Sequence, residues 1–393
     1  MSKRLLAIAL YMPLIITAVA AASLLPILPF YGQGLTASLL WLGLLLGAQD
    51  AGQMLGNVPS STLIHRFGMK ATLLMGTAIQ AVFVLLLPFS NHIALSLVLL
   101  LLSGSGFGIT AITRQTYIAG MFPKHQLGRV LGMVGGMFRI GRLIGPALGG
   151  VVASVWGIEA VFAVFSVLCT VSFVMVWIFL PNQPTPLTSQ KKQLWDVWQT
   201  HRRILMMAGI GQVVMQMTRK GWLILIPLFG ALVLQLPIDT IGYILSIAGL
   251  FDVLFFVPSG FIMDRLGRKW AIIPSLFLQG IGIACLPLAT TPLGLTIVAS
   301  FINASNGISS GTMMTVGADL APEAVRSEFL SLWRIMGDAS VVVAPLITGV
   351  IAEYLVLPNA TLFFASVAFF GGAFFWVAIP ETLPKQAQSV GDD

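Results

Sequence analysis

The sequence predicts an all-α membrane protein whose twelve transmembrane helices form two pseudo-symmetric six-helix bundles. Three observations predict this fold: the composition, the spacing of the apolar segments and an internal repeat. Of the 393 residues, 57% are hydrophobic and only 9% are charged, and the mean hydropathy is +0.94. Because soluble domains have roughly 25% charged residues, this chain cannot be one water-soluble core.

Apolar segments long enough to cross a bilayer fill almost the whole chain. Glycine, proline and charge clusters separate them into two sets of six. The expected spans are 5–31, 37–63, 71–90, 94–121, 129–155, 158–180, 204–231, 239–262, 270–289, 293–319, 328–354 and 359–379. Residues 1–4 lead into the first span without a small-residue cleavage site, so this span is expected to be retained and not removed as a signal peptide.

One long polar stretch, residues 181–203, divides the two sets of spans. Prolines end the sixth span there, and Trp195 and Trp198 among basic residues suggest a segment that lies at the membrane surface. The expected domains are a first six-helix bundle at 1–180, this linker, and a second bundle at 204–393 that ends in a short tail.

Basic residues set the expected orientation. Fifteen of the 21 Lys and Arg residues lie in loops on one side of the predicted spans, and the other six lie inside spans. Loops rich in Lys and Arg stay in the cytoplasm, so both termini are expected there, with the protein in the cell inner membrane. The formal net charge of +7 then reflects topology, and no nucleic-acid partner is expected.

The two halves repeat each other at a fixed offset of 199 residues. Matching pairs include Arg66 and Arg265, Gly68 and Gly267, Lys70 and Lys269, Gly108 and Gly307, Thr113 and Thr312, Pro123 and Pro322, and Pro146 and Pro345. The chain is therefore expected to be a duplicated six-helix unit with both copies in the same orientation. Parallel halves that rock about a central site are a transporter design.

Charged residues are unevenly distributed among the spans. The third, sixth, ninth and twelfth spans contain none in their interiors, so these helices can face lipid. The other spans contain nine: Asp50, Arg114, Arg139, Arg142, Arg219, Lys220, Asp252, Arg334 and Asp338. Each costs about 3 kcal/mol at the centre of a membrane helix, so the interior is expected to be wet or internally paired.

The loop between the eighth and ninth spans reads GFIMDRLGRK over residues 260–269. In this loop, Gly260 is expected to let a neighbouring helix approach and Gly267 to turn the chain. Asp264 is expected to accept bonds from a helix N-terminus across the seam between the halves.

The basic residues of this loop are Arg265, Arg268 and Lys269. The last two follow the turn and are expected to anchor at anionic head groups. The first-half copy of the loop is degenerate and has His65, Arg66, Gly68 and Lys70 in the equivalent positions. Because His65 replaces the acid, the gate in the first half is expected to be the weaker one.

The fifth span contains the string GRLIGPALGG over residues 141–150. Gly141, Gly145 and Gly149 are four residues apart, so they form a groove against which a partner backbone can pack. Pro146 removes one backbone hydrogen bond and is expected to bend the helix, and Gly150 ends the string.

Both strings resemble known motifs. The pattern G-x-x-x-D-R-x-G-R-K resembles the signature loop of the major facilitator superfamily. The pattern G-x-x-x-G-P-x-x-G-G is similar to the fifth-helix motif of drug/proton antiporter-type exporters in that superfamily. The resemblance covers nearly the whole chain. It implies two bundles around a midplane cavity, alternating access, and proton-coupled efflux of a small organic compound or drug.

The charged residues at membrane depth are the candidate transport residues. The candidate substrate contacts are Arg139, Arg142, Arg219 and Arg334, because guanidinium groups suit carboxylate or phosphate. The candidate proton carriers are Asp50, Asp252 and Asp338. For the residues four apart, Arg334 and Asp338, a local pair within one helix is the alternative. For Asp50 and Asp252 the alternative is a structural bond to a neighbouring helix. Six bases against three acids inside the spans favour an anionic or amphiphilic substrate.

Other function classes fit the sequence less well. An ATP-driven pump would carry a phosphate-binding loop and a channel a repeated filter loop, and the sequence shows neither pattern. An intramembrane enzyme would need catalytic clusters inside the spans, whereas all four histidines lie in or near loops. A proton-coupled importer of a small anionic metabolite is the alternative, and a membrane receptor is a more remote one.

Cys169 and Cys285 lie in apolar runs, so neither a disulfide nor a metal site is expected. No cofactor is expected, and the expected partners of a monomer are the substrate, protons and lipid.

Overall fold

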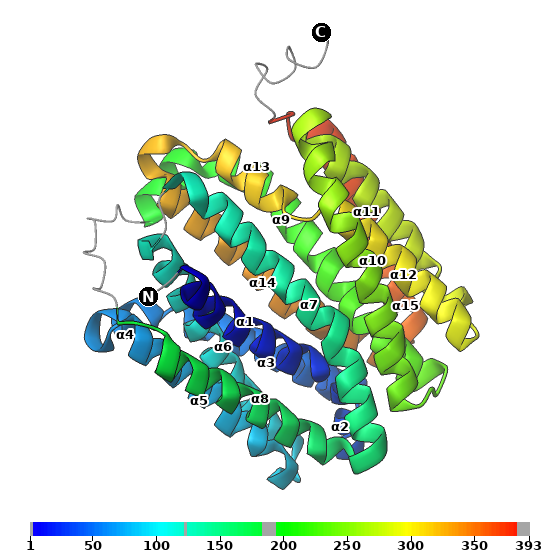
Figure 1. The fold of residues 1–393 in the computed structure, drawn as a ribbon. Coiled ribbons are helices and arrows are strands. Elements are labelled where there is room, and N and C mark those ends of the chain that lie inside the picture. Colours follow the sequence, from blue (N-terminus) through cyan, green and yellow to red (C-terminus); the bar gives the residue numbers. More distant parts are fainter. Residues whose placement is uncertain (1–2, 122–123, 183–193, 383–393) are drawn as a thin grey trace. The chain divides into compact units, whose positions relative to one another are not determined.

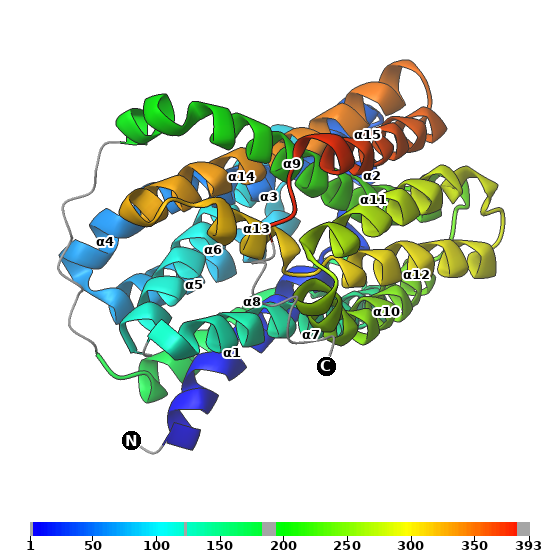
Figure 2. The same cartoon turned by 90° about the horizontal axis from the view of Figure 1, so that it is seen from above.

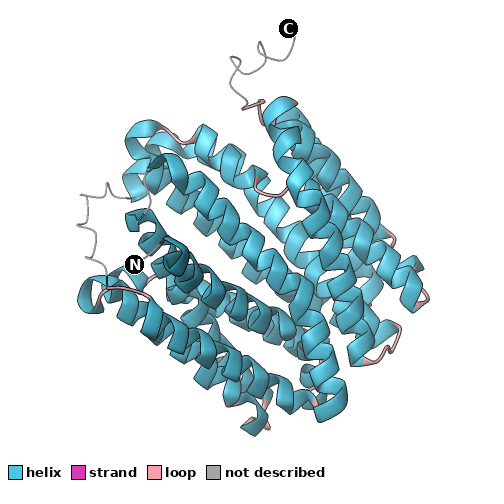
Figure 3. Cartoon of the chain, in the orientation of Figure 1, coloured by secondary structure: helices cyan, strands magenta, loops and turns pink. Residues whose placement is uncertain are grey.

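The computed structural model describes residues 3–121, 124–182 and 194–382, and helices account for nearly all of them, with no strand in these ranges (Figure 3). In the first half the helices are α1 (Lys3–Ser23), α2 (Ile27–Leu35), α3 (Leu39–Asn57), α4 (Ser60–Phe67), α5 (Met69–Leu85), α6 (Ile93–Met121), α7 (Lys124–Trp156) and α8 (Ile158–Phe179). In the second half they are α9 (Leu194–Leu228), α10 (Ile238–Arg265), α11 (Arg268–Ala284), α12 (Pro292–Ile308), α13 (Thr312–Leu320), α14 (Arg326–Tyr354) and α15 (Leu357–Ala378).

Each expected span coincides with one helix or with a pair of helices separated by a short bend. The pairs are α1–α2, α3–α4 and α12–α13. Among the described residues, eight helices are long and apolar enough to cross a membrane, and the α1–α2 pair, bent by 45°, makes a ninth. The other three spans are interrupted or carry polar residues such as Asp50 and Arg219. The predicted all-helical, twelve-span fold is therefore confirmed.

Helix packing repeats in the two halves (Figures 1 and 2). In the first half, α1 packs against α7 and α8, and α5 packs against α6 and α8. In the second half, α9 packs against α14 and α15, and α11 packs against α12 and α15. These are the same pairs one repeat later, so the sequence duplication is a duplication of the helix arrangement.

Glycines bring α3 and α6 into backbone contact. A Cβ atom added at any of four positions would lie closer than 3 Å to the backbone of the facing helix. The pairs are Gly52 with Leu101, Gly56 with Ser105, Gly104 with Gln49, and Gly108 with Gln53. On each helix the glycines are four residues apart, which places them on one face.

The described chain forms two compact units: Met1–Leu187 with Gly230–Ser246, and Thr188–Phe229 with Ile247–Asp393. We call them unit 1 and unit 2. The segment 230–246 contains the π-helical turn after α9 and the first turns of α10. It belongs to unit 1 because it packs on α7, whereas the sequence repeat places it in the second half.

The expected linker, residues 181–203, is only partly described. Residues 183–193 lie outside the described ranges, and residues 194–203 are the first turns of α9, continuous with the rest of that helix. The expected start of the second bundle at residue 204 thus falls inside a helix, and the expected position of residues 194–203 at the membrane surface stays a prediction. Trp198 packs against a buried cluster of unit 2 that includes Leu205 and Phe329. This packing accompanies the turns of α9 that precede the expected start of the span at residue 204.

Candidate functional site

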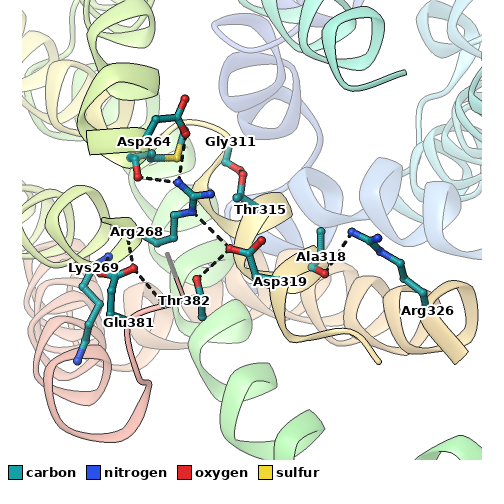
Figure 4. Close-up of polar contacts among 11 residues, drawn as sticks. Asp264, Arg268, Lys269, Gly311, Thr315, Ala318, Asp319, Arg326, Glu381 and Thr382 are labelled. Carbon is teal, nitrogen blue, oxygen red and sulfur yellow. Dashed lines mark hydrogen bonds and ion pairs between the residues drawn. The ribbon is translucent and has the colours of Figure 1, made fainter. Parts of the chain in front are cut away.

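The loop between α10 and α11 is organised around Arg268 (Figure 4). Its Nη1 donates to the carbonyl oxygen of Met263 at 2.6 Å and to Oδ1 of Asp264 at 3.1 Å. Its Nε donates to Oδ2 of Asp319, at the end of α13, at 3.4 Å. Thr382 also donates to that carboxylate, at 3.0 Å. The Arg268 side chain is only 11% exposed, so the expected anchoring of this residue in lipid head groups is wrong.

Glu381, which follows α15, binds the N-terminus of α11. Its two carboxylate oxygens accept the backbone N–H groups of Arg268 at 2.8 Å and Lys269 at 3.1 Å. Those N–H groups have no partner inside the helix, and the positive end of the helix dipole favours an anion there. The Lys269 ammonium donates to the carbonyl oxygen of Trp376 in α15 at 2.8 Å, so α11 and α15 are joined at this end.

The expectations for this loop concern the turn at Gly267, the bonding of Asp264 and the close approach at Gly260. Gly267 has a φ of +114° and turns the chain as predicted, and a Cβ there would collide with Glu381. The Asp264 side chain is 78% exposed and pairs with Arg268 one turn away, and its expected bond across the seam between the halves stays a prediction. Within unit 2, no described residue comes within 4 Å of a Cβ at Gly260, so the expected approach of a neighbouring helix stays a prediction. Arg265 is exposed at the end of α10.

The corresponding loop of unit 1 lacks this network. Gly68 turns the chain with a φ of +82°, while His65 and Arg66 are exposed and the Arg66 guanidinium lies 5.3 Å from the centre of the Phe67 ring. Lys70 is half-buried in the first turn of α5. One repeat earlier, the positions of Asp264, Asp319 and Glu381 are occupied by His65, Gly120 and Asn182. All three acids are thus absent from the first copy.

The glycine string on α7 packs against α1. A Cβ at Gly141 would meet Ala18, one at Gly145 would meet Val19 and Ala22, and one at Gly149 would meet Ser23. The groove predicted from the spacing therefore exists, and its partner backbone is α1.

A second face of α7 packs against the first turns of α10, also within unit 1. A Cβ at Gly150 would lie 2.9 Å from the Cα of Asp239. Pro146 interrupts the hydrogen bonding of the helix, and the N–H of the next residue, Ala147, donates to the Ser246 hydroxyl at 2.9 Å. This contact satisfies a backbone donor at the break that proline creates.

The candidate transport residues of unit 1 lie on α3 and α7. Asp50 is half-buried. The Arg139 guanidinium donates to the carbonyl oxygen of Gly135 in its own helix at 3.3 Å. Arg142 is exposed, and among the described residues it makes no hydrogen bond or ion pair. Taking 100° per residue, Arg139 and Arg142 lie within about 40° of the face that carries Pro146.

In unit 2 the candidates already have partners. Arg334 and Asp338 form an ion pair of 3.5 Å one turn apart on α14, so they make the local pair that the sequence allowed. Asp252 is 3% exposed and accepts the Asn306 amide N–H at 2.8 Å. Arg219 donates to Ser309, at the break between α12 and α13, through both the carbonyl and the hydroxyl oxygen at 3.1 Å.

Sequence reasoning missed Glu381, Asp319, Asn306 and Ser309. A signal existed for two of them, because Asp319 and Glu381 are acids at the ends of spans and have no acidic counterpart 199 residues earlier. Asn306 and Ser309 lie beside Gly307 and Gly311, in a polar interruption of an apolar span. Their partners, however, are 54 and 90 residues away in the chain, so no local pattern identifies the pairs.

Comparison with known proteins gives one consistent family. The sequence profile of the Major Facilitator Superfamily matches residues 11–238 and again residues 208–392. An uncharacterized transporter of the same type from Methanocaldococcus jannaschii is 22% identical over 346 residues, which are 86% of this chain and 89% of the relative. The multidrug resistance protein MdtG of a Rahnella species is 24% identical over 382 residues, 92% of this chain and 90% of that protein.

Solved structures agree with this match in fold. The crystal structure of a D-xylose–proton symporter superposes with a TM-score of 0.76 at 16% identity, and the alignment covers 95% of this chain and 97% of the symporter. A POT family transporter in complex with 5-aminolevulinic acid gives a TM-score of 0.74 at 15% identity, with 94% and 95% of the two chains covered.

Proposed function

Because the chain belongs to the Major Facilitator Superfamily and is a membrane transporter of small molecules rather than an enzyme, we propose that it exports a small organic anion in exchange for protons by alternating access. The substrate is an organic acid or an amphiphile with an exposed acidic group. Its contacts are Arg139 and Arg142 on α7, whereas Arg334 and Arg219 are bound within unit 2.

The observation that carries the proposal for an anion is the surplus of positive charge at membrane depth. Six basic and three acidic residues lie inside the spans. The structure neutralises Arg334 locally with Asp338 but leaves Arg142 without an ion pair in the described chain. A cation at membrane depth is costly, and an incoming anion relieves that cost. A guanidinium group binds carboxylate or phosphate through two parallel hydrogen bonds.

Export is supported by the glycine–proline string on α7 and by the name of the MdtG relatives, which are described as multidrug resistance proteins. Import is the alternative, and the similarity of fold to a D-xylose–proton symporter favours it. Because one fold serves both directions, transport measured in inverted and in right-side-out vesicles separates the two.

The binding test uses two amphiphiles with the same tail and opposite charge. We expect decanoate to bind the purified protein at least about tenfold more tightly than decyltrimethylammonium, a difference of about 1.4 kcal/mol. Arg142→Gln should remove most of that preference, while Arg334→Gln, which alters an arginine already paired, should change it less. Binding of the cation in preference to the anion would overturn the proposal for the substrate.

Proton coupling is tested by neutralising the three carboxylates one at a time, with Asp50→Asn, Asp252→Asn and Asp338→Asn. We expect one of these variants to lose the pH dependence of transport in proteoliposomes, because a proton carrier must change its ionisation state. Asp252 is our first candidate, since its side chain is the most buried of the three. Wild-type pH dependence in all three variants would mean that another ion drives transport or that the protein is a uniporter.

The proposed topology places both termini and the linker at 181–203 in the cytoplasm, in the inner membrane of the cell. The distribution of Lys and Arg among the loops supports it. A tag after Asp393 should therefore be labelled by an impermeant reagent only after the cells are opened, with a known outward-facing protein as the positive control. Labelling of the tag on intact cells would contradict this orientation.

A further inference from the structure

The span formed by α12 and α13 is broken inside unit 2. Helix α12 ends at Ile308, and the chain then passes through Ser309, Ser310 and Gly311, the last with a φ of +80°. The last carbonyl groups of a helix have no partner within it, and the helix dipole concentrates partial negative charge there. The break therefore creates a negative, acceptor-rich end within a transmembrane span.

Neutral donors satisfy most of that end. The Ser275 hydroxyl donates to the carbonyl oxygen of Ser305 at 2.6 Å, the Ser309 N–H to that of Asn306 at 3.2 Å, and the Ser310 N–H to that of Gly307 at 3.1 Å. The side-chain oxygen Oδ1 of Asn306 is buried and accepts no hydrogen bond from any described residue. The Ser309 carbonyl oxygen also accepts from the backbone N–H of Thr312, at 3.3 Å, and from the Thr312 hydroxyl, so the donors that the chain supplies to this end, apart from Arg219, are neutral.

Arg219 supplies the positive charge. A single nitrogen of its guanidinium, Nη2, donates to both the carbonyl oxygen and the hydroxyl oxygen of Ser309 at 3.1 Å. Ser309 itself is fully buried. The helix dipole stabilises a cation at the C-terminus of a helix, and this stabilisation is larger in a partly buried site than at the surface.

A chain of buried side chains fixes the place that Arg219 occupies. The Trp222 indole donates to Gln279 at 3.0 Å, the Gln279 amide donates to the Ser275 hydroxyl at 2.8 Å, and the Ser275 and Ser309 hydroxyls lie 2.8 Å apart. Trp222 and Arg219 are three residues apart on α9, so one face of that helix contacts both the first and the last side chain of this hydrogen-bonded series. The site is therefore built from three helices.

The first half joins the corresponding amide and hydroxyl groups directly, without the intervening Ser275 hydroxyl, whose counterpart is Gly76, and without the cation. Gln80 and Thr110 are the repeat counterparts of Gln279 and Ser309, and they are hydrogen-bonded at 3.2 Å. The counterpart of Arg219 is Ala20, and α6 continues unbroken through Thr110. The arginine and the break thus occur together, in one copy of the repeat only.

We propose that the C-terminal end of α12 is a monovalent-cation site that this protein fills with its own Arg219 guanidinium. In broken transmembrane helices, half-helix C-termini and unwound carbonyl groups coordinate coupling cations. Here a tethered cation takes that place, so Arg219 maintains the break in the span instead of contacting the substrate. This assignment does not depend on the substrate or on the direction of transport.

The first test separates charge from hydrogen bonding, using thermal unfolding of the purified full chain in detergent with no substrate added. Arg219→Lys keeps the charge, and Arg219→Gln keeps a donor but loses the charge. We expect the Lys variant to unfold within about 3 °C of the wild type and the Gln variant about 10 °C lower. Equal stability of the two variants would overturn the proposal.

The second test refills the site with a free ion. Arg219→Ala should unfold at a lower temperature than the wild type. Guanidinium chloride at about 10 mM should raise that unfolding temperature again, because one site of roughly millimolar affinity would then be mostly filled. Sodium chloride at equal ionic strength should raise it less. Arg334→Ala is the matched control, because Arg334 is held by Asp338 on a continuous helix. Equal restoration of both variants, or of neither, would refute the assignment. If Arg219→Ala does not fold, the comparison of Lys with Gln decides the question. Failure of the substrate proposal would appear in the binding assay and leave these shifts unchanged.

Discussion

Replacing Gly104 by alanine is expected to remove most of the folded protein, although the change adds only one methyl group. The new Cβ would collide with the backbone carbonyl of Gln49 in α3. A side chain could rotate away from such a contact, but a backbone carbonyl inside a packed helix cannot. The two helices must therefore separate along their whole seam, where Gly52, Gly56 and Gly108 also allow close approach.

The expected cost is about 3 kcal/mol, at the upper end of the range for an overpacked core. It should be seen as a fall in the unfolding midpoint and in the fraction of protein that elutes as a single species. Gly132→Ala is the matched control, because nothing lies within 4 Å of a Cβ at that exposed helical position in α7. Alanine is favoured over glycine in a helix by about 1 kcal/mol, so the control should be neutral or slightly stabilised. Similar behaviour of the two variants would mean that α3 and α6 do not meet as described.

Glu381→Gln is expected to reduce transport far more than Asp264→Asn does. Glu381 accepts two backbone N–H groups at the N-terminus of α11, and a neutral amide loses both the charge assistance and one acceptor. Hydrogen bonds to charged groups contribute roughly 1.5–3 kcal/mol. A change of about 2 kcal/mol in the balance between two conformations shifts their ratio roughly thirtyfold.

Asp264 is 78% exposed and makes a pair one turn away with Arg268, and exposed pairs contribute at most about 1 kcal/mol. Initial transport rates of both variants, normalised to the amount of folded protein in the membrane, provide the measurement. Glu381→Asp is the further control, since it keeps the charge and shortens the reach. A larger loss from Asp264→Asn than from Glu381→Gln would show that the loop acid, and not the residue after α15, holds this end of unit 2.

Much of the fold could be predicted from the sequence because its physical causes are local and repeated. Apolar length predicts the spans, and the 199-residue offset predicts that packing pairs recur. The four-residue spacing of Gly141, Gly145 and Gly149 predicts a groove. The same spacing of Gly104 and Gly108 predicts a groove on α6 by the same reasoning, although it does not identify α3 as the partner.

The candidate site was harder to predict because its partners are distant in sequence. The loop motif indicates which residues matter, but it does not indicate which of two acids binds the helix N-terminus. Glu381 lies 113 residues beyond Arg268, and only the packing of α15 on α11 brings them together. Gly260 is a related case, because a glycine in a motif does not show which neighbour approaches it.

The assignment of segment 230–246 to unit 1 also bears on how the chain is made. Ribosomal synthesis proceeds from the N-terminus, so α7 emerges long before Asp239, Gly242 and Ser246, the residues that cover its proline-containing face. The first unit thus acquires its last segment only after the whole of α9 has been synthesised. A truncated gene ending at residue 203 would encode the first six spans with the Ala147 N–H and the Gly150 surface uncovered, whereas one reaching residue 246 would encode the complete contact.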